Sequence, residues 1–392
     1  MRANSTRDVK MANRQFLYEC IREHKSVTMT ELEHITKLSR PTIVGLIREM
    51  EADKTVIKSG RGSSNGGRAP TLYSINAKVF YAIGIDFEFP TVRMAISDLE
   101  GTPVLTCVEH YPVDADKDET LSLLTEQLQQ FIQSSGIDKK DFLGIGMGIP
   151  GIMDSQNKSS VVIDRIHGWV DVPIWEILTE HFGIPVYIQN DVNLLAWAEK
   201  RLWPKGEFDN MQYIAIRAGL GMAVMMNGKL LDGESGNLGL IGHMIVNAEG
   251  AQCHCGSHGC LGLYTSELAL FQKYKKNTGK EISSVDDLIK LADQGDEAAL
   301  HVLECAGRYL GVGIVNVANL FDISHIVVSA RFKPDMLLKF AMPEINIRNN
   351  RPKRRKIYVS AARMDESQYA LGGCLMVIDI VRPELHLGLQ NP

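Results

Sequence analysis

Three cysteines and three histidines lie between Gly242 and Gly262 (GHMIVNAEGAQCHCGSHGCLG), in a chain that otherwise uses both residue types sparingly. Thiolate sulfur and imidazole nitrogen are ligands that Zn²⁺ prefers, and four of them complete a closed tetrahedral site. The set present here is Cys253, Cys255, Cys260 and His243. A closed site leaves no position for water, so we predict one structural Zn²⁺ per chain rather than a catalytic metal. Reduced cysteines without a metal are the alternative.

The rest of the sequence argues against other uses of this cluster. The remaining cysteines are isolated in apolar or helical surroundings, which does not indicate a disulfide framework: Cys20, Cys107, Cys305 and Cys374. No basic run flanks the cluster, and it lies far from the basic N-terminal region, so a zinc finger that reads DNA is not expected.

Composition indicates a globular chain with an uneven distribution of charge. The chain has 392 residues, 45% of them hydrophobic and 23% charged, which is typical of two or three domains. It contains no run of eighteen apolar residues, and the N-terminus has no apolar segment typical of a signal peptide, so we expect a cytoplasmic protein. Residues 1–80 carry a net charge of +6 within a total of −5. A basic end on an acidic body is compatible with an appended nucleic-acid-binding module and, equally on charge alone, with a solvated basic surface.

The pattern of this basic end is typical of a winged helix-turn-helix. Apolar residues at helical spacing in NRQFLYECIREHK predict a first helix, and two short helices follow, joined by a tight turn at Lys37–Leu38. Thr30 and Ser39 are the predicted N-caps of these helices. The second of them runs from about Arg40 to Ala52 and turns four apolar side chains inward: Ile43, Leu46, Ile47 and Met50. Two strands around a Gly/Ser-rich loop then predict a wing.

A helix-turn-helix places the start of its second helix in the major groove of DNA. We therefore predict that this module binds a double-stranded operator, with a Gly-rich wing tip that enters the minor groove. The predicted contact residues are Ser39, Arg40, Thr42, Arg48, Arg61 and Arg68. A structural three-helix module with a flexible linker is the alternative.

Beyond Asn76, strands and helices alternate, which predicts an α/β body of two lobes with a cleft. The body carries, in order, the motifs GIPG, W-x-D-V-P, IPV-x-x-x-ND-x-N, a G-x-G hairpin, GH and C-x-C-G-x-x-G-C. This series resembles the ROK family of repressors, open reading frames and sugar kinases over essentially the whole chain. The N-terminal module makes it similar to the repressor branch, of the NagC, Mlc and xylose-repressor type.

The resemblance implies an α/β fold with a winged helix-turn-helix at residues 1–76, followed by an actin-like, hexokinase-type body. Its first lobe would span residues 77–190 and its second lobe residues 191–392, with the C-terminal helix returning to the first lobe. The resemblance also implies the same four zinc ligands, with His254 and His258 as spare surface residues, a sugar between the lobes, and a homodimer or tetramer.

Two departures from the family pattern predict a regulator rather than a kinase. ROK kinases hold ATP phosphates with a loop resembling D-x-G-G-T-K, where this chain has Asp86, Phe87, Glu88, Phe89, Pro90 and Thr91. Bulky side chains, a carboxylate and a proline without an N–H are poorly suited to cradle a phosphate. A second glycine motif of the kinases is replaced by the sequence from Val328 to Arg331. A sugar kinase with an added DNA-binding module is the less favoured hypothesis.

The predicted sugar site is only half retained. Asn190 and Asp191 match the N-D pair that contacts sugar hydroxyls in the kinases, whereas Leu240 and Gly262 replace two sugar-binding glutamates. Each lost hydrogen bond to a charged group costs about 1.5–3 kcal/mol of affinity. Three hypotheses for the control of the protein therefore stay open. The effector is a sugar phosphate or another ligand that is not an ordinary hexose, or it is a sugar recognised by other groups. Alternatively, a protein partner such as a membrane sugar transporter controls the protein. The candidate other groups are His167, Trp169 and Asp171.

Overall fold

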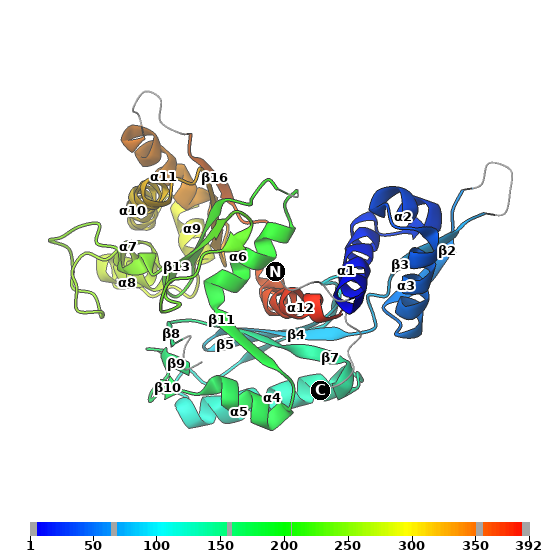
Figure 1. Cartoon of the computed structure of the whole chain (residues 1–392). Coiled ribbons are helices and arrows are strands. Elements are labelled where there is room, and N and C mark those ends of the chain that lie inside the picture. The colour runs from blue at the N-terminus through cyan, green and yellow to red at the C-terminus, as the bar shows by residue number, and fades with distance from the viewer. Residues whose placement is uncertain (1–5, 64–68, 155–158, 205, 350–355, 386–392) are drawn as a thin grey trace.

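The computed structural model describes residues 6–63, 69–154, 159–204, 206–349 and 356–385, and it divides into a small N-terminal unit and a two-lobed body (Figure 1). The N-terminal unit comprises α1 (Thr6–His24), β1 (Val27–Thr28), α2 (Met29–Thr36), α3 (Arg40–Ala52), β2 (Val56–Arg61) and β3 (Thr71–Ile75). Its strands pair antiparallel in the order β1-β3-β2, which confirms the winged helix-turn-helix. The inward face of α3 is confirmed, because Ile43, Leu46, Ile47 and Met50 are all buried.

The two predicted helix caps of this unit have different outcomes. The Ser39 side chain accepts a hydrogen bond from the Thr42 backbone N–H and caps α3, as predicted. The prediction of Thr30 as the cap of α2 is wrong, because the cap is Thr28. Glu31 stands three residues after Thr28, and the side chain of each residue accepts a hydrogen bond from the backbone N–H of the other in a capping box. Thr30 has Glu33 at the same spacing, but it lies inside α2, which begins at Met29.

The first lobe is built on a five-stranded sheet of order β11-β7-β4-β5-β6. These strands are β4 (Tyr81–Glu88), β5 (Thr91–Asp98), β6 (Pro103–His110), β7 (Phe142–Ile149) and β11 (Val186–Asn190). Helices α4 (Lys117–Ser134) and α5 (Ile174–Phe182) pack on one face. A small sheet of order β10-β9-β8 lies at the carboxyl end of β7 and is formed by β8 (Ile152–Asp154), β9 (Ser159–Val162) and β10 (Val170–Val172).

The second lobe repeats this topology with the sheet order β14-β13-β12-β15-β16. Its strands are β12 (Met211–Ile216), β13 (Leu220–Met226), β14 (Lys229–Leu230), β15 (His325–Ala330) and β16 (Tyr358–Ala361). Its helices are α7 (Gly262–Thr265), α8 (Glu267–Thr278), α9 (Val285–Asp293), α10 (Glu297–Phe321) and α11 (Asp335–Arg348). In both sheets an antiparallel three-strand meander continues into two parallel strands, so the body is an internal duplication.

A third apolar core joins the lobes. It is formed by α6 (Asp191–Arg201), α12 (Leu371–Leu385) and residues of both sheets. Helix α12 lies directly against β4 and β7, because a Cβ at Gly84 would collide with the backbone of Ala370 and Cys374, and a Cβ at Gly146 with the backbone of Gly373. The C-terminal helix therefore packs on the sheet of the first lobe.

One described helix, α10, is long and apolar enough to cross a membrane by length and composition alone. Its buried residues, among them Val302, Leu310 and Ile314, pack in the core of the second lobe. This packing accounts for its apolar composition.

Candidate functional sites

The four predicted zinc ligands come together in the structure. One ligand atom from each of His243, Cys253, Cys255 and Cys260 lies within 4.8 Å of the others. The Cys253 Sγ–His243 Nδ1 and Cys255 Sγ–Cys260 Sγ distances are both 3.7 Å. Ligands about 2.3 Å from a tetrahedral metal are separated by nearly this distance, so the donor set and its spacing fit Zn²⁺.

The backbone around the cluster explains how the ligands converge. Gly256 and Gly259 have positive φ angles of 89° and 67°, which turn the chain back on itself between the cysteines. His243 ends a short 3₁₀ turn, Ile241–His243, on the opposite side. Burial lowers the pKa of His243, which favours the neutral imidazole that binds metals.

The metal cluster forms part of the wall of an interlobe cavity of about 370 Å³, which His243 and Cys253 both line. Contacts between the lobes surround this cavity. The Asn237 side chain exchanges two hydrogen bonds of 2.9 Å with the backbone of Met153, and His254 Nε2 lies 3.6 Å from Asp164 Oδ2. His254 and His258 are both exposed.

Asn190 and Asp191 both line this cavity, at the junction of β11 and α6. The Asn190 side chain accepts a hydrogen bond from the Val192 backbone N–H, so it also caps α6. Asp191 is buried and accepts a hydrogen bond from Arg217. Burial raises the pKa of Asp191, and the Arg217 guanidinium opposes this rise.

Arg217 is the centre of a buried ionic network that joins the lobes. It follows β12 in the second lobe and donates to Asp86 through both Nη atoms, at 3.0 and 2.7 Å, and its Nη2 lies 3.0 Å from Glu88 Oε2. Burial alone would lower the pKa of Arg217, but the carboxylates around it raise it well above the usual value. Arg93 Nη1 also donates to Asp86 and Glu88, at 3.0 and 3.2 Å.

The segment predicted to replace a phosphate loop is the tight end of the β4–β5 hairpin, in which Glu88 pairs with Thr91. Phe87 is fully buried and stacks on Trp169, with ring centroids 5.6 Å apart. Phe89 is buried as well, and the Glu88 carboxylate forms ion pairs with Arg93 and Arg217. At the second altered motif, Arg331 donates two hydrogen bonds to Glu267.

The three other candidate effector residues do not line the interlobe cavity. Trp169 is 1% exposed in the core of the first lobe, and its Nε1 donates to Ser160 Oγ at 2.8 Å. His167 and Asp171 are exposed on the loop and strand on either side of it. Leu240 does line the cavity and is 43% exposed.

Sequence reasoning missed Arg93 and Arg217. Each stands alone in an otherwise apolar strand pattern, TVRMAIS and YIAIRAG. A charge is rarely buried without a partner, so an arginine in such a pattern is a signal for a buried ion pair. The sequence does not say which carboxylates are the partners.

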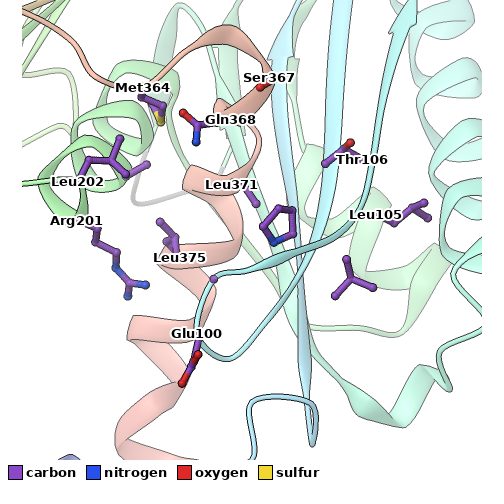
Figure 2. A pocket seen from close by; sticks show the side chains of 14 residues that line it. Glu100, Leu105, Thr106, Arg201, Leu202, Met364, Ser367, Gln368, Leu371 and Leu375 are labelled. Carbon is purple, nitrogen blue, oxygen red and sulfur yellow. The ribbon is translucent and has the colours of Figure 1, made fainter. Parts of the chain in front are cut away.

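A second hollow, of about 800 Å³, lies beside α12 and is shown in Figure 2. The side chains around it come from the β5–β6 turn, α6, α12 and the segment before α12; they include Glu100, Arg201, Leu202, Met364 and Leu375. The same turn holds the linker to the N-terminal unit, because the Leu99 N–H donates to the Ala77 carbonyl at 3.0 Å.

The predicted DNA-contacting residues lie around the start and outer face of α3 and on the wing. Ser39, Arg40, Arg48 and Arg61 are exposed, and Thr42 is half-buried. The Arg40 side chain is 63% exposed, with Nη1 3.2 Å from Glu33. Arg68 lies outside the described residues.

Comparison with known proteins gives concordant matches. The sequence model of the ROK family matches residues 82–379. The chain is 30% identical to the xylose repressor of Bacillus subtilis (strain 168) over 374 residues, which are 95% of this chain and 96% of that one. The crystal structure of a ROK family transcriptional regulator, a homolog of E. coli MLC, superposes with a TM-score of 0.78 at 22% identity and covers 97% of this chain and 98% of its own. The ROK hexokinase of Thermus thermophilus has a TM-score of 0.65 at 25% identity and covers 77% of this chain and 99% of its own.

Proposed function

We propose that this chain, which belongs to the ROK family, is a DNA-binding transcriptional repressor of a carbohydrate-utilisation operon, controlled by a sugar-like effector between its lobes. The observation that carries the proposal is the winged helix-turn-helix joined to the duplicated body. Likeness to the ROK regulator extends over 97% of the chain, whereas likeness to the hexokinase extends over 77%. The repressor-named relative indicates a regulator rather than an enzyme.

The interlobe geometry supports the proposal that no nucleotide is bound. Where a kinase would offer backbone amides to phosphates, this chain has buried Phe87, Glu88 and Phe89 and a proline without an N–H. Arg217 and Arg93 already neutralise the carboxylates of this segment. A sugar kinase remains the less favoured alternative.

For the metal site, we propose one structural Zn²⁺ per chain, held by His243, Cys253, Cys255 and Cys260. The ion would neutralise the thiolates and hold the loop and the 3₁₀ turn of the cavity wall together. The residues from Gly236 to Gly242 that line the cavity would thereby keep a fixed position relative to Asp191.

For control, we propose that an effector changes the closure of the two lobes and thereby the spacing of two DNA-binding units in a homodimer or tetramer. The hydrogen bond between Leu99 and Ala77 and the packing of α12 on the first lobe support a mechanical link from lobe to linker.

We propose that the chain is a cytoplasmic protein of three structural units. These are the DNA-binding unit at residues 1–76, the first lobe at residues 77–190 and the second lobe at residues 191–392.

Control by a protein partner such as a sugar transporter is the second candidate. It is favoured by the internal pairing of Asp191 with Arg217, which leaves this carboxylate without need of a ligand.

Footprinting and mobility-shift assays on the upstream DNA of sugar operons test the proposal. We expect a pseudo-palindromic site with half-sites about one helical turn, or a multiple of it, apart. Arg40→Ala should relax base preference at one position per half-site, and it should weaken binding to the preferred operator sequence by about 1–3 kcal/mol of binding free energy. Arg308→Ala, an exposed arginine on α10, is the matched control. Protection of a single half-site by a monomer would contradict the proposal.

A further inference from the structure

The sheet of the first lobe ends in a strand with one open side. Strand β6 is the last in the order β11-β7-β4-β5-β6 and pairs antiparallel with β5. In the described part of the chain no other strand lies beside β6, so the backbone N–H and C=O groups that alternate along its outer side are available for pairing. An edge of this kind is a template for one further strand.

The other edges of the two five-stranded sheets are shorter. β11 has five residues, and Trp175 Nε1 donates to the Val186 carbonyl on it at 2.9 Å. β14 has two residues and β16 has four. By contrast, β6 has eight residues, contains no lysine or arginine, and has its one proline at the first position, where no later pairing is interrupted. Among the described edges, β6 therefore lacks the features that normally prevent the addition of a strand.

The exposed side chains of β6 are mainly apolar. Val104 is 49% and Val108 is 52% exposed, and Thr106 lies between them on the same face of the strand. This face is on the α12 side of the sheet, because Val104 and Thr106 line the hollow of about 800 Å³ together with Leu371 and Leu375 of α12 (Figure 2). Helix α12 covers β4 and β7 on this side. A strand added to β6 would bury the two valines beside the hollow.

The sequence of β6 is complementary to itself in an antiparallel pair. With a two-fold axis at Thr106, Val104 stands opposite Val108 of a second copy, and Thr106 stands opposite its own counterpart. Apolar pairs and threonine pairs directly opposite each other stabilise antiparallel strands. With the axis at Leu105 or Cys107 instead, neither valine would face a valine. The exposed face thus selects one register.

The other residues of β6 fit the same register. On the opposite face, Leu105 would stand opposite Cys107 of the second copy, and Glu109 would face Pro103 rather than a second carboxylate. A two-fold interface requires one surface to complement itself, and like charges directly opposite each other would destabilise it. This register avoids such a conflict.

We propose that β6 pairs antiparallel with β6 of a second copy of this chain, so that two first-lobe sheets form one continuous sheet across a two-fold axis at Thr106. The inference goes beyond the proposed function, because it assigns a surface to self-association and does not depend on DNA binding. The turn before β6 holds the linker through the hydrogen bond from the Leu99 N–H to the Ala77 carbonyl. At about 3.3 Å per residue, the two copies of Pro103 would lie about 20 Å apart, so the pairing would also fix the separation of the two linkers.

Paired charge variants of the full-length protein test this register by analytical ultracentrifugation. Val104→Lys/Val108→Lys should raise the dissociation constant of the contact at least about 10-fold, because two pairs of like charges would stand opposite each other. Val104→Lys/Val108→Glu should associate more tightly than the double-lysine variant, since the same positions then form pairs of opposite charge. Val170→Lys, at a valine on β10 that is 64% exposed, is the matched control and should associate like the parent.

Disulfide trapping locates the axis independently. In a Cys107→Ser background, Thr106→Cys should form a disulfide-linked dimer on mild oxidation, because directly opposite residues have Cβ atoms about 4.5–5.5 Å apart. A mixture of the variants Val104→Cys and Val108→Cys should cross-link more than either variant alone. Cys107→Ser without a new cysteine is the blank, and Val170→Cys measures random collisions. Peptide mapping identifies the bonded residues.

Equal association of the parent and the double-lysine variant, or of the two double variants, would overturn the inference. So would Thr106→Cys that cross-links no better than Val170→Cys, or a parent that is monomeric at every concentration, which would leave the edge to a strand of another protein. Melting curves should be similar for all variants, because the changed side chains are exposed. Each of these failures leaves the proposed repressor function standing, whereas a parent protein that binds no operator contradicts that function and not the pairing of β6.

Discussion

Arg217 Nη1 donates a hydrogen bond of 2.8 Å to Asp191 Oδ2, and both side chains are buried where the two lobes meet. The carboxylate that the sequence assigns to an effector hydroxyl is therefore already paired inside the protein. An effector that uses Asp191 must share it with Arg217 or displace the guanidinium. Ligand binding and the ionic contact between the lobes thus depend on the same atoms.

Asp191→Asn should separate effector response from DNA binding. The amide removes the charge but keeps an acceptor, so we expect nearly unchanged operator affinity and a weakened effector-induced release. Breaking a buried ion pair lowers the free energy of unfolding by about 3–5 kcal/mol. We expect a loss at the lower end of this range, because Arg217 keeps its ion pairs with Asp86 and Glu88. Urea unfolding and operator release assays measure the two effects. Asp171→Asn, at an exposed carboxylate away from the cavity, should change neither. A normal effector response in Asp191→Asn would leave Asp191 with only a structural role and favour control by a protein partner.

The zinc site predicts a coupled loss of stability and function. Cys255→Ser should lower the zinc content, the melting temperature and operator affinity together, because a structural metal contributes directly to folding free energy. Elemental analysis should find one zinc per chain in the parent protein purified without chelator. Cys107→Ser on β6, a cysteine outside the cluster, should keep both zinc and stability. Parent protein free of zinc would refute the assignment.

The capping box of α2 predicts a pH-dependent contribution to the winged unit. Thr28→Ala should destabilise the unit by about 1 kcal/mol, whereas Thr30→Ala should have little effect. Hydrogen bonds from the Thr28 backbone and hydroxyl lower the pKa of Glu31. A lowered pKa in the folded state means that this stabilisation is present above the ordinary glutamate pKa and is lost as the pH falls through the folded value. Denaturation of the parent and of Glu31→Gln between pH 7 and pH 3 should differ in this acid dependence. An equal loss in Thr30→Ala would contradict the assigned cap.

Local patterns made much of this architecture predictable. Helical spacing and Ser39 predicted α3, and the strands on either side of a Gly/Ser-rich loop predicted the wing formed by β2 and β3, because both depend on neighbours in sequence. The spacing of Cys253, Cys255 and Cys260 likewise predicted a cluster that the structure brings together. The resemblance to the ROK family implied a duplicated fold, and the matching strand orders of the two sheets show it.

The partners of buried charges were not predictable in this way. Asp86 and Arg217 are hydrogen-bonded although 131 residues apart in the sequence, and Arg93 reaches Glu366 over 273 residues. Trp169 belongs to a family-like motif, yet tertiary packing buries it against Phe87 rather than exposing it to the cavity. Residue type and spacing indicate what chemistry is available, whereas burial and pairing depend on the folded arrangement.

The same ionic network predicts the absence of kinase activity. A nucleotide phosphate near the β4–β5 hairpin would meet Asp86 and Glu88, and binding would require it to compete with these carboxylates for Arg217 and Arg93. Like-charge contact in a buried site is strongly unfavourable, and the hairpin offers no glycine whose amide can approach the phosphate. Calorimetry with ATP and Mg²⁺ should therefore detect no binding, and a coupled assay across neutral sugars should show no turnover above background, with a ROK glucokinase as the positive control. Saturable ATP binding, or sugar phosphorylation that disappears in Asp191→Asn, would show that this chain is a kinase with an added DNA-binding unit.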